Sequence, residues 1–182
     1  FLASKRDARV PVPNQYFGAF QDGTLKYRGI ELRRRDTTLW VRKIQLKALE
    51  ILARANTPRE FANRVPDVMN LMEDAKRELR IGRVPLDELV IRQRLSQTIE
   101  AYKTPSPAAH AALQLQAHGR QFAPGQSLEF LFARNGTGVH AWELEEALDS
   151  GKLDTKRYYK LLDRAIQTVI DPCKPLLMPE RL

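Results

Sequence analysis

Three consecutive arginines, Arg33, Arg34 and Arg35, carry the most distinctive chemistry of this sequence. Adjacent guanidinium groups repel one another and need anions, and a guanidinium binds a phosphate or carboxylate through parallel hydrogen bonds. One interpretation is a solvated turn in which Asp36 caps the helix that follows. The other is contact with phosphate groups, or a structural pairing in which Arg34 or Arg35 is buried against a carboxylate and orients the surface.

Lys26 and Arg28 add two cations on a predicted strand just before the arginines. Residues two apart on a strand point to the same face, here about 6.6 Å from each other. Residues 1–43 hold ten Lys and Arg against four Asp and Glu, a net charge of +6, whereas the whole chain of 182 residues carries +8. A cationic patch in one segment favours a polyanionic partner, nucleic acid first and an anionic membrane surface second.

The sequence contains few residues that could form a complete enzyme active site. None of the three histidines has a neighbour at the spacing of metal ligands, and the single cysteine, Cys173, excludes an internal disulfide. The short run Gly136-Thr137-Gly138 does not match a phosphate-binding loop followed by a helix. We therefore expect no catalytic residue and no metal ligand in the chain.

No apolar run approaches the roughly 18 residues of a membrane span, and no signal-peptide pattern opens the sequence. These features predict no membrane partner and a cytoplasmic, nucleoid-associated or nuclear location, not a secreted one.

The elements that would position the basic residues begin with a predicted hairpin. An aromatic-rich strand over 15–20 is joined to a second strand over 25–32 by a turn with the Asp22-Gly23 signal. Helices follow over about 37–55, from Thr57 onward, over 106–118 and from 154, and short strands are predicted near 89–94 and 127–133. Strands and helices in separate segments predict an α+β fold.

The basic hairpin has the motif order of a known family. Tyr16-Phe17-Gly18 leads through Lys26-x-Arg28-Gly29-x-Glu31 to Arg34-Arg35-Asp36. This series resembles family B DNA polymerases, in which a Lys-Lys-x-Tyr hairpin precedes a strand ending Gly-hydrophobic-Glu-x-x-Arg-Arg-Asp. The similarity continues over roughly residues 13–170, through Leu89-Val90-Ile91, Tyr102-Lys103, Gly119, the run 124–128, and Asp154 followed by Tyr158-Tyr159.

The resemblance implies that residues 1–36 are the end of the palm and residues 37–182 the thumb. The hairpin would complete a palm-like sheet, and the thumb would be mostly helical with a small β element. The family's paired lysines fall on Pro13-Asn14, so the motif keeps only its tyrosine here. Lys5, Arg6 and Arg9 are the residues that could replace that charge.

The implied function is binding of the sugar–phosphate backbone of a primer–template duplex, without sequence preference, during replication or repair synthesis. The DNA-binding candidates are Tyr16, Lys26, Arg28, Arg33, Arg34, Arg35 and Lys103. The family's catalytic aspartates would lie upstream, so the Mg²⁺ ions of the complete polymerase would be held elsewhere and the chain should be inactive alone. Its partners would be the duplex and the remaining palm and fingers.

Two other classes of function stay open on the sequence alone. One is a stand-alone basic module that binds nucleic acid. The other is a helical domain that binds a protein, with the basic patch incidental to its function. Binding that does not respond to salt would favour the protein-binding domain.

Overall fold

The computed structural model describes residues 14–171, which form two compact units. Within this range the first unit comprises residues 14–34, 41–78 and 160–171, and the second comprises 35–40 and 79–159. The model has both helices and small sheets, and the fold is α+β, as predicted. No helix of residues 14–171 is long and apolar enough to cross a membrane.

The first unit opens with an antiparallel hairpin of β1 (Tyr16–Ala19) and β2 (Leu25–Arg28). The Asp-Gly turn forms as predicted: Gly23 has a φ of +83°, and its N–H donates to the carbonyl oxygen of Phe20 at 2.9 Å. A single 3-10 turn, η1 (Glu31–Arg33), then leads into α1 (Leu39–Leu52). Four residues, 29–32, therefore separate the hairpin from the arginine run.

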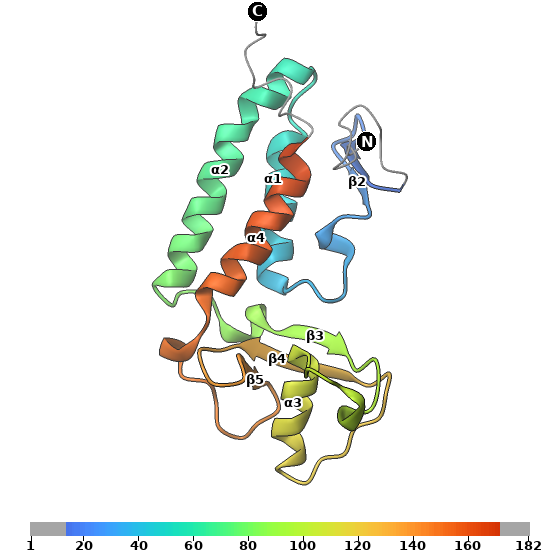
Figure 1. Cartoon of the computed structure of the whole chain (residues 1–182). Helices are drawn as coiled ribbons and strands as arrows, with labels where there is room; N and C mark the ends of the chain where they lie inside the picture. The colour runs from blue at the N-terminus through green and yellow to red at the C-terminus, as the bar shows by residue number, and fades with distance from the viewer. Residues whose placement is uncertain (1–13, 172–182) are drawn as a thin grey trace, which may run out of the picture. The chain divides into compact units, whose positions relative to one another are not determined.

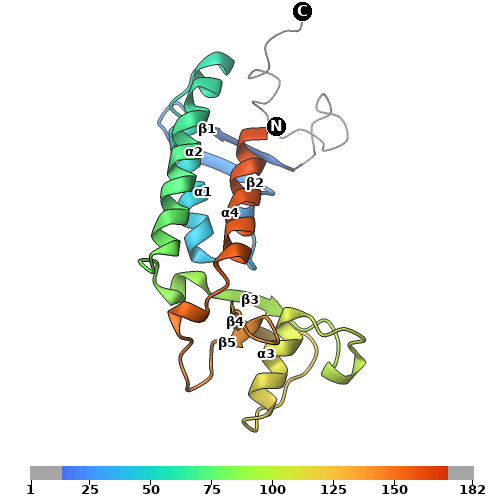
Figure 2. The same ribbon diagram turned by 60° about the vertical axis from the view of Figure 1, so that its left-hand side comes forward.

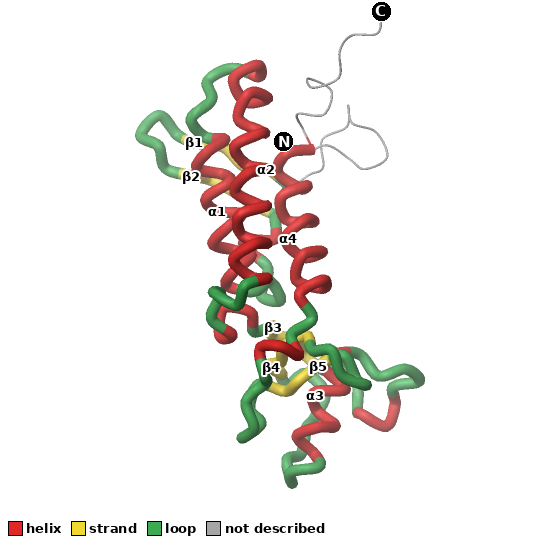
Figure 3. Tube along the Cα trace, turned by 90° about the vertical axis from the view of Figure 1, so that its left-hand side faces the viewer, coloured by secondary structure: helices red, strands yellow, loops and turns green. Residues whose placement is uncertain are grey.

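Helices α1, α2 (Pro58–Arg80) and α4 (Thr155–Ile170) supply the core of this unit, and they lie side by side in Figures 1 and 3. The start of α2 is a capping box, because Thr57 Oγ1 accepts from the N–H of Glu60 while the Glu60 carboxylate accepts from the N–H of Asn56. An apolar stripe runs along this helix, and four of its residues are buried, namely Val65, Val68, Met72 and Leu79.

The second unit is built on a three-stranded antiparallel sheet of β3 (Ile91–Arg94), β4 (Ser127–Phe132) and β5 (Val139–Ala141). Helix α3 (Pro107–Gln116) packs against β4 and β5, as Figure 2 shows. The short 3-10 helices η2 (Leu86–Leu89), η3 (Ile99–Ala101) and η4 (Ser150–Lys152) connect these elements. The sequence predicted β3 and β4 but not β5.

A buried tyrosine joins the start of α4 to the sheet of the second unit. The hydroxyl of Tyr158 accepts a hydrogen bond from the N–H of Phe132 at 3.0 Å. Burial raises the pKa of Tyr158 far above its usual range, so the hydroxyl stays neutral. The Arg157 guanidinium lies 3.5 Å from the centroid of the Phe132 ring and donates to the carbonyl oxygen of Gly138. The base of α4 is thereby fixed to β4 and to the loop before β5.

Gly29 is required where the hairpin ends. Its φ is +70°, and a Cβ atom would lie 2.3 Å from the carbonyl oxygen of Asn14. We expect Gly29→Ala to lower the free energy of unfolding by more than the roughly 1–2 kcal/mol of the left-handed conformation, since the backbone must also shift. Gly23→Ala is the matched control, because its φ is +83° but nothing lies within 4 Å of the added Cβ. Thermal melts that show the same loss for both variants would contradict this account.

Candidate nucleic-acid interface

One face of the hairpin gathers three of the predicted DNA-binding residues. The register places Tyr16 opposite Arg28 and Gly18 opposite Lys26. Lys26 and Arg28 are exposed, whereas Leu25 and Tyr27 on the other face are half-buried. The predicted alternation along this strand is confirmed, so Tyr16, Lys26 and Arg28 form one surface, named here the hairpin face.

The opposite face of the hairpin is anchored to the helices. The ring of Phe17 stacks on that of Phe61 in α2, with centroids 5.9 Å apart and planes at 27°. An offset-stacked aromatic pair contributes beyond its buried area, by about 0.5–1.5 kcal/mol. This contact fixes which side of the hairpin turns away from the helices.

The acids near the hairpin are engaged in structural hydrogen bonds. Asp22 Oδ1 accepts from the N–H of Thr24 at 2.9 Å, and the hydrogen bonds with Thr24 lower the pKa of this exposed carboxyl. Glu31 is turned toward the helices, where its carboxylate accepts from Gln45 at 3.1 Å and from Thr168 at 3.2 Å. Neither Lys26 nor Arg28 forms an ion pair with a carboxylate within residues 14–171, so their charge is not neutralised by a neighbouring acid there.

The three arginines lie on the segment that joins η1 to α1. All three are exposed, which makes the expected burial of Arg34 or Arg35 in an ion pair wrong. Glu31, which precedes the arginines, pairs with Arg164 of α4, with Nε and Oε1 3.5 Å apart. The carbonyl oxygen of Arg34 accepts from the Arg42 guanidinium, so the backbone of the arginine run is held while its side chains face solvent.

Gln45 holds the arginine segment to the helices. It is fully buried, and its Oε1 accepts from the N–H of Leu32 at 2.6 Å. Its Nε2 donates to Glu31 and, at 2.8 Å, to the carbonyl oxygen of Ala165 in α4. One amide side chain thus connects η1, α1 and α4.

Lys103 is exposed in the loop between η3 and α3, within the second unit. The neighbouring Tyr102 hydroxyl accepts from the N–H of Ser96 at 3.0 Å, and the hydrogen bonds with Ser96 lower the pKa of this phenol. These bonds close the loop that presents Lys103. Lys103 belongs to the second unit, whereas the hairpin face belongs to the first.

The described residues hold no cluster of three or more His, Cys, Asp and Glu side chains that could bind a metal ion. Lys5, Arg6, Arg9 and Cys173 lie outside the described residues.

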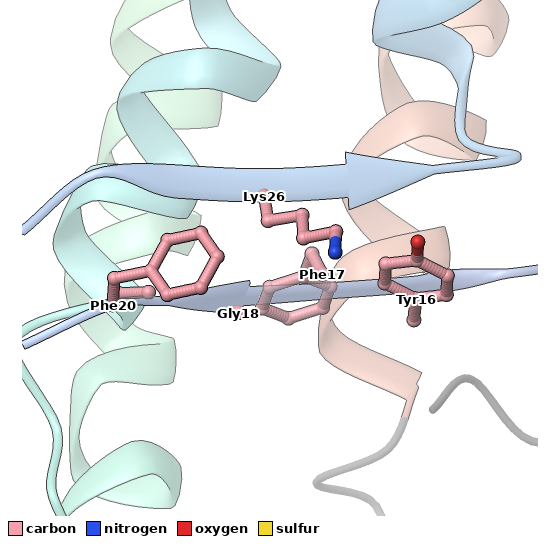
Figure 4. A pocket seen from close by; sticks show the side chains of 6 residues that line it. Tyr16, Phe17, Gly18, Phe20 and Lys26 are labelled. Carbon is pink, nitrogen blue, oxygen red and sulfur yellow. The ribbon is translucent and has the colours of Figure 1, made fainter.

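Sequence reasoning missed Gly18 and Phe20, which lie beside the hairpin face. Phe20 is 56% exposed, and the Lys26 ammonium lies 6.0 Å from its ring centroid. Tyr16 and Gly18 are two apart within β1, and Phe20 follows the strand two positions later, so a period of two was the signal that could have grouped them. Together with Phe17, Ala19 and Lys26 they line a hollow of about 170 Å³, seen from close by in Figure 4.

Comparison with known proteins identifies the family of the chain. The family model for DNA polymerase family B matches residues 14–173, and the chain belongs to this family. It is 25% identical over 156 residues to DNA polymerase 1 of Saccharolobus solfataricus, covering 85% of this chain and 17% of that protein. It is 26% identical over 190 residues to the DNA polymerase catalytic subunit of human herpesvirus 7, covering 88% and 19%.

The fold is also similar to a solved structure, that of the family B DNA polymerase from the hyperthermophilic archaeon Pyrobaculum calidifontis. The TM-score is 0.64 at 22% sequence identity, with 92% of this chain and 20% of that chain covered. The chain thus corresponds to about a fifth of the length of these polymerases.

Proposed function

We propose that the chain is the end of the palm and the thumb of a DNA-directed DNA polymerase, and that it grips primer–template duplex by its sugar–phosphate backbone. On this proposal residues 1–36 belong to the palm and 37–182 to the thumb. The observation that carries it is the hairpin face, where exposed Lys26 and Arg28 lie beside Tyr16 with no acid paired to either within residues 14–171.

Contact with the backbone would make the binding independent of sequence. Phosphate contacts fix the register of a protein on DNA without reading bases. Arg28 lies directly across from Tyr16, so a tyrosine ring at the minor groove would have a cation beside it to contact an adjacent phosphate. The minor groove shows nearly the same acceptors for all base pairs, which suits an enzyme that must copy any sequence.

The role of the chain in catalysis would be positioning. Holding the primer end in line with the incoming nucleotide lowers the barrier by removing translational and rotational freedom. Because residues 14–171 hold no fitting ligand cluster, we place the carboxylates that bind Mg²⁺ in the remaining part of the polymerase. The partners on this proposal are the duplex and the rest of the palm and fingers.

The first test is the salt dependence of duplex binding by the full chain. Binding through between two and five phosphate contacts, as Lys26, Arg28 and the arginine run could provide, predicts a slope of log affinity against log salt of about −2 to −4.5. Fluorescence anisotropy on a labelled blunt duplex measures this slope, and duplexes of unrelated sequence should give the same affinity. A flat response to salt would overturn the proposal and favour a protein-binding domain.

A further inference from the structure

The hollow on the hairpin face exists because residue 18 is a glycine. Nothing lies within 4 Å of the position that a Cβ atom would occupy at Gly18, and the aromatic residues Tyr16 and Phe20 lie two positions to either side. Lys26 stands across from Gly18 on the paired strand, and Figure 4 shows its ammonium group above the strand between the aromatic rings. The missing side chain thus leaves a gap in an otherwise aromatic and cationic surface.

The size of the hollow restricts what it can hold. At about 170 Å³ it is close to the roughly 150 Å³ cavity of an engineered protein that binds benzene. It therefore suits a single aromatic ring system, and it is too small for a base pair. Its lining is mostly ring carbon and strand backbone, with Lys26 as the one charged residue.

The residues at the edge of the hollow, Phe20 and Lys26, favour a nucleobase over other aromatic rings. Phe20 is 56% exposed and has the Lys26 ammonium 6.0 Å from its centroid, which is the combination that bases and phosphates of single-stranded DNA bind. A base inside a duplex is covered on both faces by its neighbours, so only an unpaired base can offer a ring face to Phe20. An aromatic side chain of a protein partner would fit the ring site but would leave Lys26 and Arg28 without anions.

We propose that the hollow over Gly18 seats one unpaired base of a DNA strand that continues beyond the duplex. The base stacks on Phe20, and Lys26 contacts its flanking phosphate. This inference rests on the proposed duplex binding and adds to it a site for the single strand at the duplex end. It assigns Phe20 and Gly18 as positioning residues of the primer–template junction.

Two variants change the hollow and leave Tyr16, Lys26 and Arg28 of the hairpin face in place. Gly18→Val places a side chain at the hollow, where the added Cβ meets open space, and a β-branched residue suits a strand. Phe20→Ala removes the stacking surface but leaves every cation in place. Leu113→Ala is the control, since Leu113 is also a large exposed apolar residue, 41% exposed, and lies on α3 in the second unit.

The test compares three DNAs with the full chain: a blunt duplex, the same duplex with a short single-stranded extension, and the same extension made of abasic nucleotides. The abasic strand keeps its phosphates and lacks bases, so the difference between the two extensions reports base contact alone. Both a 5′ and a 3′ extension are needed. For the wild-type chain we expect roughly 5- to 100-fold tighter binding of the normal extension on one of the two sides.

Gly18→Val and Phe20→Ala should lose this preference and keep their affinity for the blunt duplex, and Leu113→Ala should behave as the wild type. A 2-aminopurine in the extension should change its fluorescence on binding only where the preference is present.

Equal wild-type affinity for normal and abasic extensions, with blunt-duplex binding intact, would overturn the base seat and leave the backbone proposal standing. Loss of salt-dependent binding to every DNA would overturn both. Melting curves check that each variant is folded. If Gly18→Val does not fold, Phe20→Ala alone tests whether the hollow binds a base.

Discussion

Gln45→Leu is expected to lower the free energy of unfolding by about 2–4 kcal/mol. Leucine keeps most of the volume of glutamine but can neither accept from Leu32 nor donate to Glu31 and Ala165. Glu31 would keep its bonds to Thr168 and Arg164, so the loss falls mainly on the N–H of Leu32 and the contact with α4. Chemical denaturation of the full chain measures the change.

Gln121→Leu is the matched control, because this glutamine is exposed, and we expect it to change stability by no more than about 0.5 kcal/mol. Gln45→Glu tests the mechanism further. It keeps an acceptor for Leu32 but places a second buried carboxylate beside Glu31, which raises the pKa of the new group in the folded state. Its deficit relative to wild type should therefore be smallest at acidic pH and grow as the pH rises through that raised pKa. An unchanged deficit from acid to neutral pH would argue against a like-charge contact.

Replacing Gln45 should also weaken binding at the proposed DNA-binding surface. The same amide holds the backbone of η1, and Arg33 is the last residue of that turn. A loosened turn leaves the guanidinium groups charged but less well placed, so affinity should fall while the salt slope changes little. Removal of a cation differs, because it reduces both the affinity and the salt slope.

Features with local causes were predictable from the sequence. The Asp22-Gly23 turn, the capping box at Thr57 and the two faces of β2 each depend on residues within a few positions of one another, and the structure contains all three. Strand β5 was missed because three residues are too few to show a period, and β5 exists through its pairing with β4.

Features with long-range causes were not predictable. Glu31 binds Gln45 and Thr168, which lie 14 and 137 positions away in the chain, and nothing near Glu31 indicates either partner. The burial considered for Arg34 or Arg35 is wrong, because both side chains are exposed, and the exposure of a side chain depends on packing that its sequence neighbours do not show. The hollow at Gly18 likewise depends on the register that brings Lys26 opposite it.

The sharpest test of the hairpin face is the double variant Lys26→Ala with Arg28→Ala. Both side chains are exposed, so we expect the free energy of unfolding to change by about 0.5 kcal/mol or less. If each contacts one phosphate, the salt slope should shrink by about 1.8 and affinity at 0.1 M salt should fall by roughly 60-fold through lost counterion release. Anisotropy titrations and melts on the same preparations give both quantities.

A control must separate contact from net charge. Lys152→Ala with Lys156→Ala removes the same two charges from exposed positions of the second unit, and it should leave the slope nearly unchanged. If this variant weakens binding as much as the hairpin variant, the effect is one of overall charge and the hairpin face is not the interface.

The triple variant Arg33→Ala, Arg34→Ala and Arg35→Ala completes the comparison. Because all three side chains are exposed and the bond from Arg42 goes to a backbone oxygen, the variant should stay folded. Its slope should shrink by up to about 2.7, one step of about 0.9 for each arginine that contacts a phosphate. A triple variant that melts early would restore a structural role for the arginines. One that melts normally and binds normally would confine the duplex contact to the strand cations, Lys26 and Arg28.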